Sequence, residues 1–259
     1  MPSELLTERH GPVLVMTISD PATRNTLSRQ VIAAGIEALG VAEADTSLRC
    51  VILRGDGPHF CAGGNLRGLM ERRAAGPAAQ RQMLDHLHQL IEALRVFTKP
   101  VIACVEGAAA GAGFSLALAC DLIVAADDAR FILSYGRIGL SPDGGATWSL
   151  AQALPRALVQ KLVWLGEPVS AQQLQAWGLV GWLAGSGQAF SEALRVAQRL
   201  SEMAPNALTS AKELVQQAGT QTLTQQLGAE RDHFITNLFH ANAAEGLQAF
   251  IDKRPPAFR

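Results

Sequence analysis

Two short apolar segments, each running directly into a glycine-rich loop, constrain the fold of this chain more than any other feature. Residues 50–53 (CVIL) lead to the loop 59–65, and residues 101–105 (VIACV) lead to the loop 106–113. Apolar runs of this length that end at glycine are typical of buried strands, and helical patterns lie between them. Strands that alternate with helices predict an α/β architecture, in which ligands bind where strand ends meet helix starts.

The other elements follow from periodicity and from helix-start signals. Residues 5–9 and 13–18 predict two strands joined by a turn, and helices are expected to begin at Ser28 and at Gly76-Pro77. We expect a core over residues 1–202 and a helical region over residues 203–259 that packs on its own core or on another subunit. Further helical patterns cover residues 155–164, 170–177, 188–203, 205–217 and 221–239.

Composition excludes several classes of function. The chain has 259 residues, 17% of them charged, and a formal net charge of -1. It contains no run of Lys and Arg, which argues against nucleic-acid binding. Charged residues interrupt the N-terminal segment where a signal peptide needs an apolar core, and no apolar run approaches the length of a membrane span. We therefore expect a cytoplasmic protein without membrane contact.

The cysteines indicate neither disulfides nor a metal site. They lie in apolar or glycine-rich surroundings, without CxxC spacing or clustered histidines. The sequence predicts buried, reduced thiols and no bound metal. The four positions are Cys50, Cys61, Cys104 and Cys120.

The glycine-rich loops favour a site for a developing negative charge. Small residues let backbone N–H groups approach a ligand, and two such loops supply two converging donors, each worth about 3–4 kcal/mol at a transition-state oxyanion. The loops lack the Lys-Ser/Thr ending of a P-loop and the Gly-x-Ser-x-Gly of a nucleophile elbow. Downstream, Asp143 lies in residues 141–147 (SPDGGAT). Its local sequence fits a helix N-cap as well as a catalytic carboxylate.

Three segments, residues 60–63, 107–121 and 138–145, together resemble the crotonase, or enoyl-CoA hydratase/isomerase, superfamily. The similarity extends from residues 24–27 to residues 245–250. This resemblance implies a spiral of ββα units and a C-terminal helical region that forms trimers, often paired into hexamers. It also implies acyl-CoA thioester substrates and an oxyanion hole for a thioester enolate. No cofactor is expected, because coenzyme A arrives as part of the substrate.

Carried over by position, the resemblance assigns roles to individual residues. The N–H groups of Gly64 and Ala112 are the expected oxyanion donors, and Asp143 is the expected proton-transferring residue. Leu66, Leu140 and Phe131 are expected to form apolar walls that exclude water. The coenzyme A and acyl site is expected to include Arg24, Leu27, Ala62, Gly63, Leu66, Arg67, Tyr135, Leu140 and, from a neighbouring subunit, Phe239 and Lys253. For the basic side chains Arg24, Arg67 and Lys253, simple solvation is an equal alternative.

The sequence departs from the hydratase pattern at two positions. Hydratases of this superfamily carry two glutamates that hold and activate water, and here those positions are Ser115 and Tyr135. Neither side chain is a carboxylate, so the two-glutamate route to hydration is not expected. An aspartate at position 143 resembles dienoyl-CoA isomerases and, most closely, ring-1,2-epoxyphenylacetyl-CoA isomerases. The preferred interpretation is therefore an acyl-CoA isomerase.

Other interpretations stay open. Hydration by another route is one. Dehalogenation is another: in 4-chlorobenzoyl-CoA dehalogenases the matching aspartate is a nucleophile, and a histidine on the long helix activates water. His88 occupies the position of that histidine. Those enzymes, however, carry tryptophan where Tyr135 stands. By sequence alone, a packed or half-exposed helix residue is a more common role for His88 than a catalytic one. Some crotonase-fold proteins are non-catalytic binding proteins, but this chain has no basic surface run to support binding of RNA.

Overall fold

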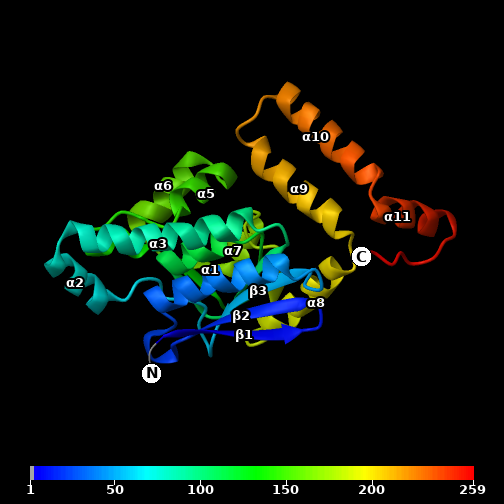
Figure 1. The fold of residues 1–259 in the computed structure, drawn as a ribbon. Helices are drawn as coiled ribbons and strands as arrows, with labels where there is room; N and C mark the ends of the chain where they lie inside the picture. The colour runs from blue at the N-terminus through cyan, green and yellow to red at the C-terminus, as the bar shows by residue number, and fades with distance from the viewer. Residues whose placement is uncertain (1–2) are drawn as a thin grey trace.

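The centre of the fold is a mostly parallel sheet, seen in a computed structural model that describes residues 3–259 (Figure 1). Its strands are β1 (Glu4–His10), β2 (Val13–Ser19), β3 (Cys50–Gly55), β4 (Val101–Val105), β6 (Leu122–Ala126) and β9 (Trp182–Ala184), in the order β1-β2-β3-β4-β6-β9. β1 and β2 pair antiparallel, and all later neighbours pair parallel. β3 and β4 are apolar and almost wholly buried, as strands covered on both faces must be. The register pairs Val51 with Val101, so the loops that follow β3 and β4 begin side by side.

A second, smaller sheet joins these two loops. It consists of β5 (Ala108–Ala110), β7 (Arg130–Ile132) and β8 (Val169–Ser170), in the order β5-β7-β8. Cys61 N–H donates to the Ala108 carbonyl at 3.1 Å, and Ala110 N–H donates to the Cys61 carbonyl at 2.9 Å. The first glycine-rich loop is therefore hydrogen-bonded directly to the strand that begins the second.

Several helices around the sheets begin at residues whose side chains accept backbone hydrogen bonds. Ser28 accepts from Val31 N–H at 3.2 Å, and Asn65 accepts from the N–H groups of Arg67 and Gly68. Such caps satisfy donors that the first helical turn leaves free. α8 packs against β3 and β4, and α1 packs against α3. The helices of this part are α1 (Arg29–Ala44), α2 (Leu66–Ala75), α3 (Pro77–Val96), α4 (Ala112–Ala119), α5 (Ala146–Ala153), α6 (Arg156–Leu165), α7 (Ala171–Ala176), α8 (Ala189–Ser201) and the short 3-10 helices η1 (Pro21–Thr23) and η2 (Ser134–Ile138).

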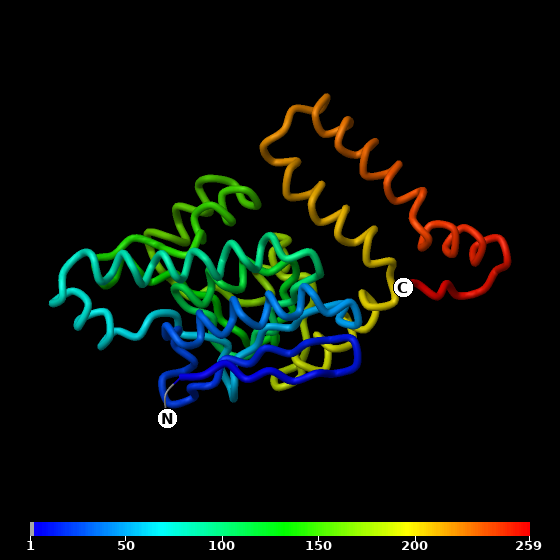
Figure 2. Tube along the Cα trace, viewed as in Figure 1, coloured from blue at the N-terminus to red at the C-terminus, as the bar shows by residue number. Residues whose placement is uncertain are grey.

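Three C-terminal helices extend away from the α/β part of the chain (Figures 1 and 2). They are α9 (Pro205–Ala218), α10 (Leu223–Leu238) and α11 (Ala241–Ile251). Large apolar side chains on or beside them are exposed in the single chain, with Phe234 at 68%, Phe239 at 84% and Phe250 at 85%. Exposed apolar surface of this kind is typical of subunit contacts. Assembly through this region, and the division of the chain into 1–202 and 203–259, stay predictions.

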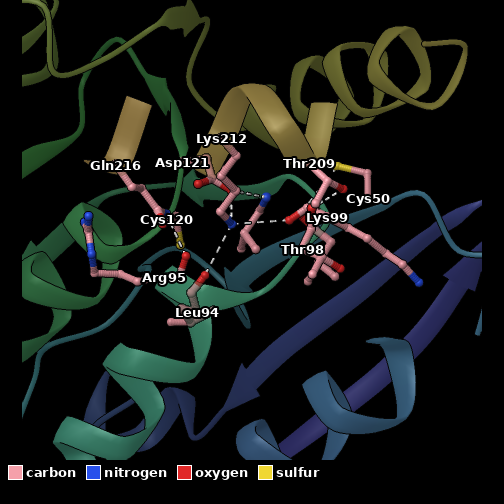
Figure 3. A network of polar contacts seen from close by, with 12 residues as sticks. Cys50, Leu94, Arg95, Thr98, Lys99, Cys120, Asp121, Thr209, Lys212 and Gln216 are labelled. Carbon is pink, nitrogen blue, oxygen red and sulfur yellow. Dashed lines mark hydrogen bonds and ion pairs between the residues drawn. The ribbon is translucent and has the colours of Figure 1, made fainter. Parts of the chain in front are cut away.

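Polar contacts attach α9 to the α/β part (Figure 3). Lys212 Nζ lies 2.8 Å from Asp121 Oδ2, and Gln216 Nε2 donates to the Arg95 carbonyl at 2.7 Å. No residue of α9 is fully buried. These directed contacts, rather than a buried apolar stripe, therefore fix the position of α9.

All four cysteines are buried free thiols, as the sequence predicted. Burial raises the pKa of Cys50, Cys61 and Cys104 to about 12 each. The thiolate is the reactive form of cysteine, so these groups are inert at neutral pH. Within residues 3–259, no three His, Cys, Asp or Glu side chains are grouped so as to hold a metal ion. In the same described range, no helix is long and apolar enough to span a bilayer.

Candidate active site

The two glycine-rich loops touch each other at Gly63. This residue has a φ of 85°, and a Cβ atom there would lie 2.6 Å from the Ala110 carbonyl oxygen and 2.9 Å from Ala112 N. Its own carbonyl accepts from Leu27 N–H at 2.8 Å. Only glycine fits this position, because any side chain would force the loops apart.

The contact brings together the two N–H groups that the sequence predicted as oxyanion donors. Ala112 is the first residue of α4, where a helix leaves its N–H groups without intrahelical acceptors. Among residues 3–259, neither Gly64 N–H nor Ala112 N–H takes part in the hydrogen bonds of loops, turns or caps. α4 is buried over its whole length. The role of these donors at a thioester stays a prediction.

Asp143 is held by the two residues that replace the expected glutamates. Tyr135 donates its hydroxyl to Asp143 Oδ1 at 2.6 Å, and Ser115 Oγ donates to the Asp143 backbone carbonyl at 2.8 Å. Ser115 is 1% exposed and Tyr135 is 9% exposed, so both are fixed by their surroundings. The result is a single carboxylate that accepts one side-chain hydrogen bond in the described chain, at Oδ1.

Burial sets the protonation behaviour of this carboxylate. Burial raises the pKa of Asp143, and the Tyr135 hydroxyl and the charge of His88 oppose that rise without cancelling it. Burial and the adjacent carboxylate raise the pKa of Tyr135, which therefore stays protonated and donates. A carboxylate whose pKa is shifted toward neutrality is suited to both accept and return a proton.

The helix-cap interpretation of Asp143 is wrong for its side chain. The N-cap position of α5 is Gly145, which makes no side-chain cap hydrogen bond, and only the Asp143 backbone carbonyl contacts the helix, accepting from Ala146 N–H at 3.4 Å. Gly144 and Gly145 both have positive φ angles, of 61° and 80°. This turn starts the helix after the aspartate and leaves its carboxylate facing Tyr135.

A cavity of about 710 Å³ lies between α2, the start of α3 and residues 138–140. Leu66, two residues after Gly64, and Leu140, three before Asp143, both line it. They are 60% and 46% exposed, so they form the open walls of the cavity rather than a sealed lid. The expectation for Phe131 is wrong: it is 1% exposed and packs in the core against Phe114, with ring centroids 5.0 Å apart.

The other predicted site residues separate into a near group and a distant group. Ala62 N–H donates to the Arg24 carbonyl at 2.9 Å, so these two lie with Gly63 and Leu27 at the first loop. Arg67 is exposed in the first turn of α2. His88 is exposed on α3, and its positive charge lowers the pKa of Asp143. Phe239 and Lys253 lie on the C-terminal helical region, apart from the core (Figure 1). Their approach to a nucleotide of a neighbouring subunit stays a prediction.

Sequence reasoning missed the role of Asn25. Its side chain is 0% exposed and donates to the carbonyls of Asp56 and His59 at 2.9 and 2.7 Å, while its Oδ1 accepts from Asp20 N–H at 2.9 Å. It thereby fixes the segment that leads into the first glycine-rich loop. Its φ of 59° is a conformation that asparagine tolerates better than most residues. Asparagine directly before Thr26 and Leu27 was the available signal.

Comparison with known proteins identifies the family. The family model for enoyl-CoA hydratase/isomerase matches residues 8–259. A 2,3-dehydroadipyl-CoA hydratase of Escherichia coli K12 is 35% identical over 257 residues, and the match covers 99% of each chain. A 1,2-epoxyphenylacetyl-CoA isomerase of the same strain is 33% identical over 247 residues, and the match covers 95% of this chain and 94% of the relative. The crystal structure of an enoyl-CoA hydratase from Polaromonas sp. JS666 superposes with a TM-score of 0.98 at 52% identity, over 99% of this chain and 100% of that one. The chain belongs to the crotonase, or enoyl-CoA hydratase/isomerase, family of acyl-CoA enzymes.

Proposed function

We propose that this enzyme is an acyl-CoA isomerase in which Asp143 is the only acid/base group. The observation that carries the proposal is the hydrogen bonding of Asp143 to Tyr135, with Ser115 on its backbone. The two positions that would hold a water-activating pair of glutamates instead support a single carboxylate. The relatives include both a hydratase and an isomerase by name, and this arrangement favours the isomerase.

The reaction follows from one base and two backbone donors. The thioester oxygen accepts hydrogen bonds from Gly64 N–H and Ala112 N–H, which acidifies the carbon next to the carbonyl and the vinylogous carbon. Ionised Asp143 takes a proton from one of these carbons, and the C–H electron pair moves into the conjugated system to give a dienolate. Protonated Asp143 then returns the proton to another carbon, and the oxyanion collapses to C=O. Because the two proton transfers are sequential, one carboxylate suffices.

The test is a panel of linear, branched and aromatic enoyl-CoA thioesters incubated with the purified enzyme. Products are separated by chromatography and identified by mass spectrometry. An isomerase gives a new peak of unchanged mass. A product heavier by one water molecule from any member of the panel, at rates that exceed isomerisation, would contradict the proposal.

Dehalogenation is a second candidate, because the charge of His88 acts on Asp143. In that reaction Asp143 would displace halide from an aromatic ring carbon, and water activated by His88 would hydrolyse the resulting ester. Halide release from 4-chlorobenzoyl-CoA tests it. We expect none above the uncatalysed rate, because Tyr135 stands where these dehalogenases carry tryptophan.

Replacing Tyr135 by phenylalanine is expected to move the acid limb of the pH profile to higher pH. Asp143 must be ionised to act as base, so kcat/KM rises with pH through its pKa. The Tyr135 hydroxyl lowers that pKa by donating a hydrogen bond to the ionised carboxylate, so its loss raises the pKa of Asp143 further. The measurement is kcat/KM against pH for both proteins. An acid limb at the same pH in the variant would show that the bond does not tune the base.

Gly63→Ala is expected to reduce activity by about 10²–10³-fold, the loss associated with one misplaced oxyanion donor. The added methyl would meet the Ala110 oxygen at 2.6 Å and Ala112 N at 2.9 Å, in a backbone conformation that alanine rarely adopts. Gly40→Ala is the matched control and should behave like the wild type. Gly40 is an exposed residue of α1, and a Cβ atom added there would have no neighbouring atom within 4 Å. Full activity of Gly63→Ala would mean that loop contact does not set the donor geometry.

A further inference from the structure

The 710 Å³ cavity is bordered by a guanidinium group that has no acidic partner among the described residues. Arg72, in the last turn of α2, is half-buried and lines this cavity. Its Nε donates to Gln80 Oε1 on α3 at 2.7 Å. Among the described residues 3–259, its two terminal nitrogens have no hydrogen-bond acceptor and no carboxylate within ion-pair distance. The side chain is thus held in one orientation with most of its donors unused.

The direction of Arg72 is known from its neighbour on the same helix. A Cβ atom added to Gly68 would lie 3.0 Å from Arg72 Nη1, so the side chain folds back along α2 toward its N-terminus. The N-terminus of α2 is capped by Asn65, the residue that follows Gly64 in the sequence. The guanidinium therefore lies beside Gly68 on the surface of α2, where it borders both the 710 Å³ cavity and a second cavity of 560 Å³.

Most of the side chains that line the cavity are apolar. Leu66 and Leu140 lie nearest in sequence to Gly64 and Asp143, and Leu69, Met70 and Ile138 complete the apolar lining. Such walls suit a methylene chain or a ring. Arg73 also lines the cavity, so both charged side chains of its lining are positive. The second cavity of 560 Å³, which Arg72 also borders, is lined by the acidic Asp20. The Asp20 carboxylate accepts a hydrogen bond from the Thr23 hydroxyl at 2.7 Å rather than from Arg72.

We propose that the acyl site takes thioesters whose acyl group ends in a carboxylate, and that Arg72 binds this carboxylate. A guanidinium donates two parallel hydrogen bonds to a carboxylate, and Gln80 leaves both terminal nitrogens free to do so. This inference rests on the proposed position of the thioester at Gly64 and Ala112. It names the substrate class of that site: dicarboxylic acyl-CoA thioesters rather than simple fatty acyl-CoA thioesters.

Binding of unreactive thioesters tests the inference without relying on any reaction. The probes are adipyl-CoA and hexanoyl-CoA, which have the same chain length and differ in ending in a carboxylate or a methyl group. Suberyl-CoA and octanoyl-CoA form a longer pair, and free coenzyme A is the reference. Dissociation constants are measured by titration calorimetry for the wild type, Arg72→Met and the control Arg156→Met, which replaces an exposed arginine of α6 outside these cavities.

We expect the wild type to bind a dicarboxylic probe about ten- to a hundred-fold more tightly than its methyl-ended partner. Arg72→Met should remove this preference and leave the affinity for free coenzyme A unchanged, and Arg156→Met should change neither. Arg72→Lys, which keeps the charge, should retain part of the preference and serves if the methionine variant folds poorly. No preference in the wild type would overturn the inference. So would an equal loss for both probes and free coenzyme A, which would assign Arg72 to a coenzyme A phosphate. Neither result would bear on whether Asp143 isomerises.

Discussion

Asp143→Asn is expected to lower kcat by about 10²–10⁴-fold, the usual contribution of a positioned general acid or base. Asparagine keeps the size of the side chain and an oxygen that accepts from the Tyr135 hydroxyl, now 2.6 Å from Asp143 Oδ1. It cannot accept a proton from carbon at neutral pH. The affinity for acyl-CoA should stay nearly constant, because the oxyanion donors belong to Gly64 and Ala112. Steady-state kinetics and calorimetric titration of the same preparation measure the two quantities.

The same variant carries its own folding control. Burial raises the pKa of Asp143 in the native protein above its ordinary value of 3.8, so the native state favours the protonated form. The associated stability is complete below the ordinary pKa and is lost as pH rises through the raised native pKa. Asparagine does not titrate, so Asp143→Asn should unfold at neutral pH no more easily than the wild type. An inactive variant that also unfolds more easily would point to a structural role instead.

Lys212→Met is expected to lower the free energy of unfolding by about 3 kcal/mol, at the lower end of the range for breaking a buried ion pair. The side chains of Lys212 and Asp121 are 12% and 23% exposed, and Nζ and Oδ2 are 2.8 Å apart (Figure 3). Lys212 Nζ also lies 3.5 Å from the Leu94 carbonyl. Methionine fills the space of the lysine stem but leaves the Asp121 carboxylate buried without its cation.

Chemical denaturation measures this loss, and the double variant Asp121→Asn with Lys212→Met is its control. Burial raises the pKa of Asp121, and Lys212 is the strongest influence that lowers it. Without the lysine the carboxyl group is more easily protonated, so the cost of the single variant should shrink as pH falls. The double variant, which has no buried charge, should recover most of the lost stability. A single variant as stable as the wild type would mean that α9 is held by its other contacts.

The first four strands of the large sheet and most helices could be predicted because their signals are local, whereas β6 and β9 were not predicted. Residues 5–9, 13–18, 50–53 and 101–105 lie within β1 to β4, and the helices expected at Ser28 and Pro77 begin there. The strands of the small sheet were not predicted, because two or three residues are too few to show a period. Their pairing depends on contacts such as Cys61 with Ala109, far apart in the sequence.

The site shows the same division between local and long-range information. The glycine-rich loops and Asp143 stand out as motifs in the sequence, so they could be predicted as parts of the candidate site. The bond from Tyr135 to Asp143 was not, because it depends on the path of the intervening chain. Gly139 has a φ of 71°, and Leu140 N–H donates to the Tyr135 carbonyl at 3.0 Å. This turn brings residue 143 back to residue 135, and local propensity does not indicate in which direction the Asp143 carboxylate then points.

The central claim is that the enzyme moves a proton between carbons and adds no water. The most direct measurement is the reaction of the best acyl-CoA substrate in oxygen-labelled water, followed by mass spectrometry of the first product. A product that keeps the mass of the substrate and carries no labelled oxygen is the result expected from Asp143 as sole acid/base group. Incorporation of one labelled oxygen into the acyl group at the rate of turnover would contradict it and would require a water-activating group in this site.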